Sequence, residues 1–191
     1  MQHSANKRRA GLCLCLALAL CALVGPSAAQ AGSGGVGVGG GSGGGQTVKG
    51  KKAKLVNGKA LAPKSAPASV KRAIAAGNAI RHKPYRLGGG HAKWKDSAYD
   101  CSGAASYVLG KYGARKLDAP MPSGSFNKYG RSGAGKWITV YSNGGHMYVK
   151  VAGLRFDTSN TGSRKDGPRW TTDVKGGKAN GPFHVRHPVG L

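Results

Sequence analysis

A long stretch without core-forming residues most constrains what this 191-residue chain can fold into. Residues 32–45 contain ten glycines, two serines and two valines, a composition that behaves as a flexible coil. Residues 46–68 follow with six lysines, two prolines and no acidic residue, which is typical of a disordered basic linker. We therefore expect the ordered domain to occupy residues 69–191, a length that suits one hydrophobic core.

The first 31 residues have the order of a secretory signal peptide. Three basic residues lie within residues 1–9, and residues 10–24 are uncharged and rich in leucine and alanine. Ala29 and Ala31 then supply the small residues of a cleavage site. The apolar run is shorter than the roughly 20 residues that a membrane span needs. We expect a secreted protein without a transmembrane segment, located outside the cell, on its wall, or in the periplasm of a cell with an outer membrane.

Basic residues dominate the charge of the chain. Thirty lysines and arginines and six acidic residues give a formal net charge of +24, or +21 without the three basic residues of the signal peptide. Such a charge favours anionic partners. Aromatic residues make up only 7% of the chain and are not interleaved with basic residues, as a stacking platform for nucleic acid would require. Because export also disfavours an intracellular role, we expect anionic cell-wall polymers as partners, and no nucleic acid.

Two helices are expected near the start of the ordered domain. From Ser69, the expected N-cap, apolar and small residues recur at helical spacing until Pro84 ends the helix. A second helix is expected to begin at Cys101, with Asp100 as its N-cap and a glycine at its end.

Strand patterns follow the two helices. Residues rich in β-formers, or alternating between apolar and polar, occupy 137–141, 146–152, 154–159 and 183–186. Ala152 and Gly153 are expected to form a tight turn between two of these strands. Helices followed by an antiparallel sheet indicate an α+β fold.

Cys101 is the one cysteine beyond the signal peptide, and its place suits a nucleophile. The free N–H groups and the dipole at a helix N-terminus favour a thiolate over a thiol. A histidine is the usual base, and His146 starts an alternating strand after two glycines, which presents its imidazole rigidly. His184 and His187 face opposite sides of the last strand, so we expect neither a metal site nor a cofactor.

Three motifs surround these residues. They are Pro84-Tyr85-Arg86-Leu87-Gly88-Gly89, Tyr99-Asp100-Cys101-Ser102-Gly103, and Gly145-His146 at the start of a strand. Together they resemble the NlpC-type peptidoglycan endopeptidases, over about residues 70–160. The resemblance implies a papain-like α+β domain in which a helix that begins at the cysteine packs on an antiparallel sheet. It also implies Cys101 as nucleophile, His146 as base, and Tyr85 as a tyrosine near the nucleophile that binds substrate or supports the oxyanion.

The third residue of the catalytic triad depends on the register of two strands. With a two-residue turn, Asp157 lies diagonal to His146 on one face of the sheet. A change of one residue in the turn would place Thr158 and Asn160 there instead. We choose Asp157, because a carboxylate both orients and stabilises an imidazolium. The competing interpretation is an exposed Asp157 paired with an arginine.

Substrate-binding residues are expected around the nucleophile: Tyr85, Gly89, His91 and Ser102. His91 follows three glycines and is expected to line the site. Ser102, like Asp100, has an alternative role in shaping the start of the helix. The insert between Gly90 and Asp100, which contains Trp94, is longer than the family spacing and is expected to form a lid.

The sequence therefore predicts a secreted, monomeric cysteine peptidase that hydrolyses peptide bonds of peptidoglycan stem peptides through an acyl-enzyme. By resemblance, the usual bond joins D-glutamate to a diamino acid. An amidase or an acyltransferase with the same Cys-His pair is an alternative. Another is a non-catalytic cationic protein that binds the cell wall. For residues 46–68, a solvated spacer and an electrostatic anchor to an anionic wall are both open. The sequence does not separate action on the cell's own wall from action on a competitor's.

Overall fold

The computed structural model describes residues 46–159, 167–174 and 181–191. The predictions for residues 1–45, namely the signal peptide, its cleavage site and the glycine-rich segment, lie outside the described residues, and so does Asn160. Within the described part, no helix is long and apolar enough to cross a membrane.

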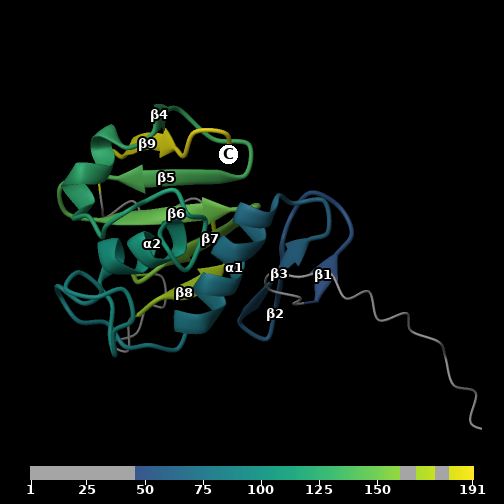
Figure 1. Ribbon diagram of the computed structural model, residues 1–191, viewed down its shortest axis with the longest axis horizontal. Coiled ribbons are helices and arrows are strands. Elements are labelled where there is room, and N and C mark those ends of the chain that lie inside the picture. The colour runs from purple at the N-terminus through teal and green to yellow at the C-terminus, as the bar shows by residue number, and fades with distance from the viewer. Residues whose placement is uncertain (1–45, 160–166, 175–180) are drawn as a thin grey trace, which may run out of the picture. The chain divides into compact units, whose positions relative to one another are not determined.

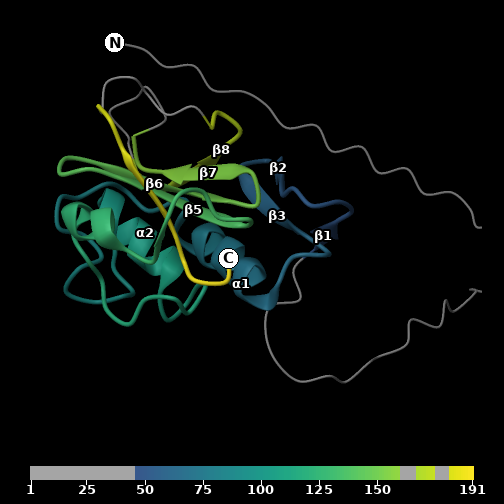
Figure 2. The same ribbon diagram turned by 90° about the horizontal axis from the view of Figure 1, so that it is seen from above.

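Two helices pack on one face of a six-stranded sheet whose paired strands are antiparallel (Figures 1 and 2). The helices are α1 (Ala68–Ile80) and α2 (Cys101–Leu109), and a 3-10 helix, η1, spans Ser123–Lys128. The strands, in their order across the sheet, are β4 (Arg131–Ser132), β9 (His184–His187), β5 (Ile138–Ser142), β6 (Met147–Val151), β7 (Leu154–Asp157) and β8 (Arg169–Thr171). The predicted α+β architecture, with helices before an antiparallel sheet, is confirmed.

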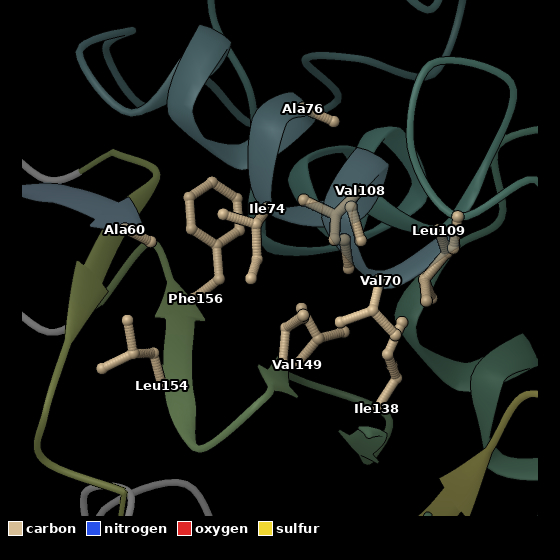
Figure 3. Packing of buried hydrophobic residues seen from close by; sticks show 14 of the residues in the cluster. Ala60, Val70, Ile74, Ala76, Val108, Leu109, Ile138, Val149, Leu154 and Phe156 are labelled. Atoms are coloured by element: carbon tan, nitrogen blue, oxygen red, sulfur yellow. The ribbon is translucent and has the colours of Figure 1, made fainter. Parts of the chain in front are cut away.

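The core lies between the helices and this sheet (Figure 3). Val70 and Ile74 of α1 and Val108 of α2 are buried against the sheet residues Val149 and Phe156. Every second residue of β6 and β7 points into this layer, because side chains alternate across a strand. The polar residues between them are therefore presented on the opposite face of the sheet.

The hairpin between β6 and β7 fixes the register on which the third triad residue depends. Val151 pairs with Leu154, so the turn contains only Ala152 and Gly153. Both turn residues have positive φ, 48° and 89°, as in the tight turns that suit the twist of a hairpin. The predicted two-residue turn is confirmed, and the same register carries on to set Asp157 opposite Tyr148.

Residues 46–68 do not form the disordered linker that the composition predicts. They contain β1 (Thr47–Val48), β2 (Lys54–Val56) and β3 (Lys59–Pro63), which form a separate three-stranded sheet in the order β1-β3-β2. We call residues 46–64 the lysine-rich module. The domain boundary predicted at residue 69 is thus wrong.

Small residues explain why this lysine-rich module is ordered. Ala60 and Ala62 alternate along β3 and are buried on the side of α1. The side chain of Asn78 accepts a hydrogen bond from Ala60 N (2.9 Å) and donates one to Ala60 O (2.8 Å), which satisfies part of the strand edge. Asn57 and Gly58 form the β2–β3 turn with positive φ, and this Asn-Gly pair was the hairpin signal that the charge composition concealed.

Element boundaries differ from the predictions by a few residues. Helix α1 begins at Ala68 after Pro67, which makes no side-chain cap, so the assignment of Ser69 as N-cap is wrong. The helix ends at Ile80, well before Pro84. The short elements β4, β8 and η1 were not predicted, because pieces of two to six residues carry little periodicity.

Candidate active site

Cys101 is the first residue of α2, and Asp100 is the N-cap, as predicted. Asp100 has extended backbone angles, and its Oδ1 accepts a hydrogen bond from Gly103 N at 2.7 Å. The Cys101 thiol is free and partly exposed. A cysteine in this position lies beside the positive end of the helix dipole.

Glycines allow the preceding loop to lie directly against the first turn of α2. Gly89 O accepts a hydrogen bond from Asp100 N (3.2 Å), and Gly88 N donates to Asp100 Oδ2 (2.9 Å). A Cβ at Gly103 would overlap the carbonyl oxygen of Gly89, and a Cβ at Gly89 would overlap that of Ala98. The Gly88-Gly89 and Cys101-Ser102-Gly103 motifs thus lie against each other, with the backbone of Gly89 in close contact with that of Gly103.

Tyr85 lies near Cys101 because its segment pairs with the segment that leads to Cys101. Tyr85 and Tyr99 form an isolated parallel bridge, in which Tyr99 N donates to Pro84 O at 3.0 Å. Tyr85 remains 44% exposed beside Cys101.

The part of the insert after Gly90 that contains Trp94 does not close over Cys101. The indole packs on Gly110, at the end of α2 opposite to Cys101. The predicted lid is therefore wrong for this part of the insert, since the aromatic ring fills space against the far end of the helix.

A tight turn presents His146. Asn143 N donates to His146 O at 2.9 Å, and Asn143 Oδ1 accepts from Gly145 N (2.9 Å) and His146 N (2.8 Å). The side chain thus mimics a backbone acceptor, which is typical of asparagine in turns. Sequence reasoning missed Asn143, although an asparagine before two glycines was a signal for such a turn.

The imidazole of His146 contacts Asp157 on the neighbouring strand. His146 Nε2 lies 3.0 Å from Asp157 Oδ1 and 3.2 Å from Ser159 Oγ. Asp157 Oδ1 also accepts from Thr158 N (2.6 Å) and Ser159 N (3.1 Å). Because Nε2 is engaged with the carboxylate, Nδ1 is the nitrogen left for the thiol, with which the ring also interacts.

These contacts decide the charge of His146. Burial lowers the pKa of His146, but hydrogen bonds to Asp157 and to Cys101 outweigh burial and raise it to about 9. For Asp157, burial alone would raise the pKa, because it disfavours the charged carboxylate. The hydrogen bond from His146 and the charges of His146 and Arg155 outweigh burial and bring the pKa of Asp157 below its ordinary value. At neutral pH the site therefore holds an imidazolium between a carboxylate and the Cys101 sulfur.

The structure thus brings together Cys101, His146 and Asp157. Asp157 is buried, so the competing interpretation of an exposed aspartate is wrong, although an arginine, Arg155, does pair with it. Thr158 contributes its backbone N–H to the Asp157 carboxylate instead of replacing it. The catalytic roles of the three residues stay predictions.

An open cleft of about 400 Å³ gives access to Cys101. It is lined by Tyr85, Leu87, Gly88, His91, Asp100, Cys101, Ser102, Pro122, Ser123, Gly144 and Gly145. His91 Nε2 lies 3.1 Å from both Asp100 Oδ1 and Ser102 Oγ, so these three polar groups form one wall beside the sulfur.

Of the four predicted substrate-binding residues, Tyr85, His91 and Ser102 line this cleft. Gly89 is absent from the lining, and its backbone accepts a hydrogen bond from Asp100 N and donates one to Arg86 O. It supports the site from behind instead of facing a ligand.

Comparisons with known proteins give distant structural matches. No protein-family model and no curated protein sequence matches the chain. Solved structures similar to it include a mutated form of the Resuscitation Promoting Factor Interacting protein RipA, with 21% identity, a TM-score of 0.43, and coverage of 62% of this chain and 61% of that one. Rv1477, a hypothetical invasion protein of Mycobacterium tuberculosis, matches with 18% identity, a TM-score of 0.42, and coverage of 62% and 63%.

The chain thus spans about six tenths of the length of the solved chains it matches. At these identities and TM-scores, the matches do not assign the chain to a family. The function must therefore be argued from the geometry of the site.

Proposed function

We propose that the protein is a cysteine peptidase that hydrolyses peptide bonds in the stem peptides of bacterial peptidoglycan. The observation that carries this proposal is the thiol of Cys101 at a helix N-terminus, in an open cleft, interacting with an imidazole that Asp157 holds. A nucleophile, a base and a group that orients the base are the parts that acyl transfer requires.

The first half of the reaction forms a thioester. The Cys101 thiolate attacks the carbonyl carbon of the scissile bond, and the oxygen takes up the negative charge. The N–H of Cys101, in the first turn of α2 where no intrahelical acceptor exists, is placed to stabilise that oxyanion. The His146 imidazolium then gives its proton to the leaving amine as the C–N bond breaks.

The second half restores the enzyme. Neutral His146 takes a proton from a water molecule, which attacks the thioester and releases a carboxylic acid. The same imidazolium that donated to the amine is thereby regenerated beside the thiolate. Asp157 stabilises the charged imidazole ring in both halves of the reaction and stays ionised throughout.

The substrate class is supported by the motifs around Cys101 and by the charge of the chain. The resemblance to NlpC-type endopeptidases favours peptidoglycan, and with it a bond between D-glutamate and a diamino acid. Stem peptides carry carboxylates, and a formal net charge of +24 favours an anionic polymer. The predicted signal peptide agrees with a substrate outside the cytoplasm.

The test is solubilisation of purified sacculi by the protein from residue 32 onward. Dye-labelled sacculi should release soluble label with the native protein and not with Cys101→Ala or His146→Ala, both folded by circular dichroism. Asn127→Ala, a substitution in η1 outside the triad, serves as the control that keeps activity. Release by Cys101→Ala at the native rate would exclude the proposed chemistry.

A second function, non-catalytic binding of anionic wall polymer, is favoured by the lysine-rich module. Its six lysines are exposed, and none of them forms an ion pair with another described residue. Unpaired, exposed cations on an ordered sheet can face an anionic surface together. Binding of sacculi without any thiol-dependent release would favour this function over the peptidase.

A further inference from the structure

Arg155 and Asp157 lie two residues apart on β7 and therefore point to the same face of the sheet. This is the face opposite to the core residues Leu154 and Phe156. The side chains of both Arg155 and Asp157 are nonetheless almost completely buried, with 1% and 0% of their surfaces exposed. A buried arginine at this place needs an explanation, because arginine is rarely buried without a partner.

The two oxygens of the Asp157 carboxylate have different partners. Arg155 Nη2 donates a hydrogen bond to Oδ2, while Oδ1 faces His146 Nε2 at 3.0 Å. With Oδ2 held by the guanidinium, the carboxylate cannot rotate without losing an ion pair. The clamp therefore fixes the direction in which Oδ1 meets the imidazole.

Aromatic rings hold the guanidinium in turn. The Arg155 guanidinium carbon lies 4.2 Å from the centre of the Tyr148 ring, within the range of a cation–π interaction. Tyr148 stacks on Tyr141, with ring centres 4.7 Å apart and an interplanar angle of 9°, and Lys150 Nζ lies 4.6 Å from the Tyr141 ring centre. Arg155 is thus packed against a rigid aromatic surface of β5 and β6.

The guanidinium also depends on Asp157. Its Nε and Nη1 are buried and have no hydrogen-bond partner among the described residues. If Asp157 were protonated, the cation would remain buried without its counterion, which is strongly unfavourable. The pair therefore resists protonation of the carboxylate.

We propose that Arg155 is a positioning residue, which aims Asp157 at His146 and keeps the carboxylate ionised during the thiol chemistry. This inference rests on the proposed peptidase function. It adds to the triad a buried group that acts only through Asp157.

Other charged or titratable groups also face this carboxylate. His146, just before β6, and Tyr148, within β6, face the Asp157 carboxylate. Arg169 of β8 pairs with Asp157 in the strand register. Asp173, which follows β8, acts electrostatically on Tyr148. Arg169 is an arginine on the neighbouring strand β8, and Lys150 of β6 stands opposite Arg155, so the test must separate the effect of Arg169 from that of Arg155.

The test measures the rate at which iodoacetamide alkylates Cys101, as a function of pH, in the full chain. Alkylation requires the thiolate and no cell-wall substrate, so it remains measurable even if wild type releases nothing from sacculi. Arg155→Met should move the acid limb of the profile to higher pH, because an imidazole that Asp157 no longer holds in a fixed direction stabilises the thiolate less. Arg155→Lys keeps the charge and should leave the limb close to its wild-type position.

Three further variants make the result decisive. Arg186→Met is the matched control: Arg186 donates hydrogen bonds to the carbonyls of residues 128–130 and does not touch the triad, so it should leave the limb in place. Arg169→Met should also leave it in place. If Arg155→Met does not fold, Arg155→Gln, which keeps one donor without the charge, should show the same upward shift. An acid limb at the wild-type pH in the folded, uncharged Arg155 variant, with only a lower rate, would overturn the proposal.

Discussion

Replacing Asp157 by asparagine should weaken the charged state of His146. Asparagine has nearly the same shape, but it carries no charge to stabilise an imidazolium, and it leaves the buried Arg155 guanidinium without its counterion. The pKa of His146 is about 9, against 6.5 for an ordinary histidine. This difference corresponds to about 3 kcal/mol in favour of the imidazolium, and against the opposing effect of burial it comes from the hydrogen bonds and charges of Asp157 and Cys101.

The consequence is a change in pH dependence. His146 must be protonated to give its proton to the leaving amine, so activity should be present below a pH of about 9 and be lost above it. In Asp157→Asn the imidazolium loses its proton at a lower pH. The alkaline limb of kcat/KM should therefore move to lower pH by about one to two pH units.

The assay is cleavage of a synthetic stem peptide between pH 5 and 10. The ratio of variant to wild-type kcat/KM should fall by about three- to twentyfold between pH 6.5 and pH 8.5. Asp118→Asn, in a separate hollow beside Tyr112, is the control and should retain the wild-type limb. A uniform loss at every pH in Asp157→Asn would refute the reasoning, because it would mean that the carboxylate supplies no charge stabilisation.

Two further outcomes are expected. Gly103→Ala should lower the free energy of unfolding by about 1 to 3 kcal/mol and abolish cleavage, because its Cβ would overlap Gly89 O, and this strain outweighs the gain in helix propensity. Thermal unfolding measures this loss, and Gly124→Ala, where a Cβ would meet open space, is the control. An unchanged melting temperature in Gly103→Ala would contradict the close contact. Replacing Lys49, Lys51, Lys52 and Lys54 by glutamine in the Cys101→Ala protein should weaken its binding to sacculi by about 10²- to 10³-fold at low salt, at about 1 kcal/mol for each lysine near an anionic surface. A pelleting assay at increasing salt measures this binding. Equal binding at low salt by Cys101→Ala with and without the four lysine substitutions would exclude an electrostatic role for the lysine-rich module.

Local patterns were sufficient for the main helices and the central hairpin. The Asp-Cys pair marked the start of α2, and Ala152-Gly153 fixed the register that joins Asp157 to His146. The lysine-rich module was missed, because its order depends on Ala60 and Ala62 packing against a helix, whereas composition reports only the exposed lysines. Tertiary contact overrode composition there.

The close placement of Cys101, His146 and Asp157 was predictable, because a helix start, a strand after two glycines and the register of a two-residue turn indicated it. Arg155 and Asn143 were not, since their roles come from contacts across strands and within a turn, which depend on side-chain direction. Trp94 gave the opposite error: an aromatic residue in a long insert suggested a lid, yet the ring packs against Gly110. Whether an aromatic residue covers a site or fills a core is decided by packing.

The most direct test of the central claim is mass spectrometry of the fragments that the protein from residue 32 onward releases from purified peptidoglycan, with Cys101→Ala beside it. The account predicts new amino and carboxyl ends within the stem peptide, formed only when the thiol is present. Free lactyl carboxylates on the sugar, formed by cleavage between glycan and peptide, would contradict the peptidase in favour of an amidase. Tight binding without any new ends would contradict catalysis altogether and leave a cationic wall-binding protein.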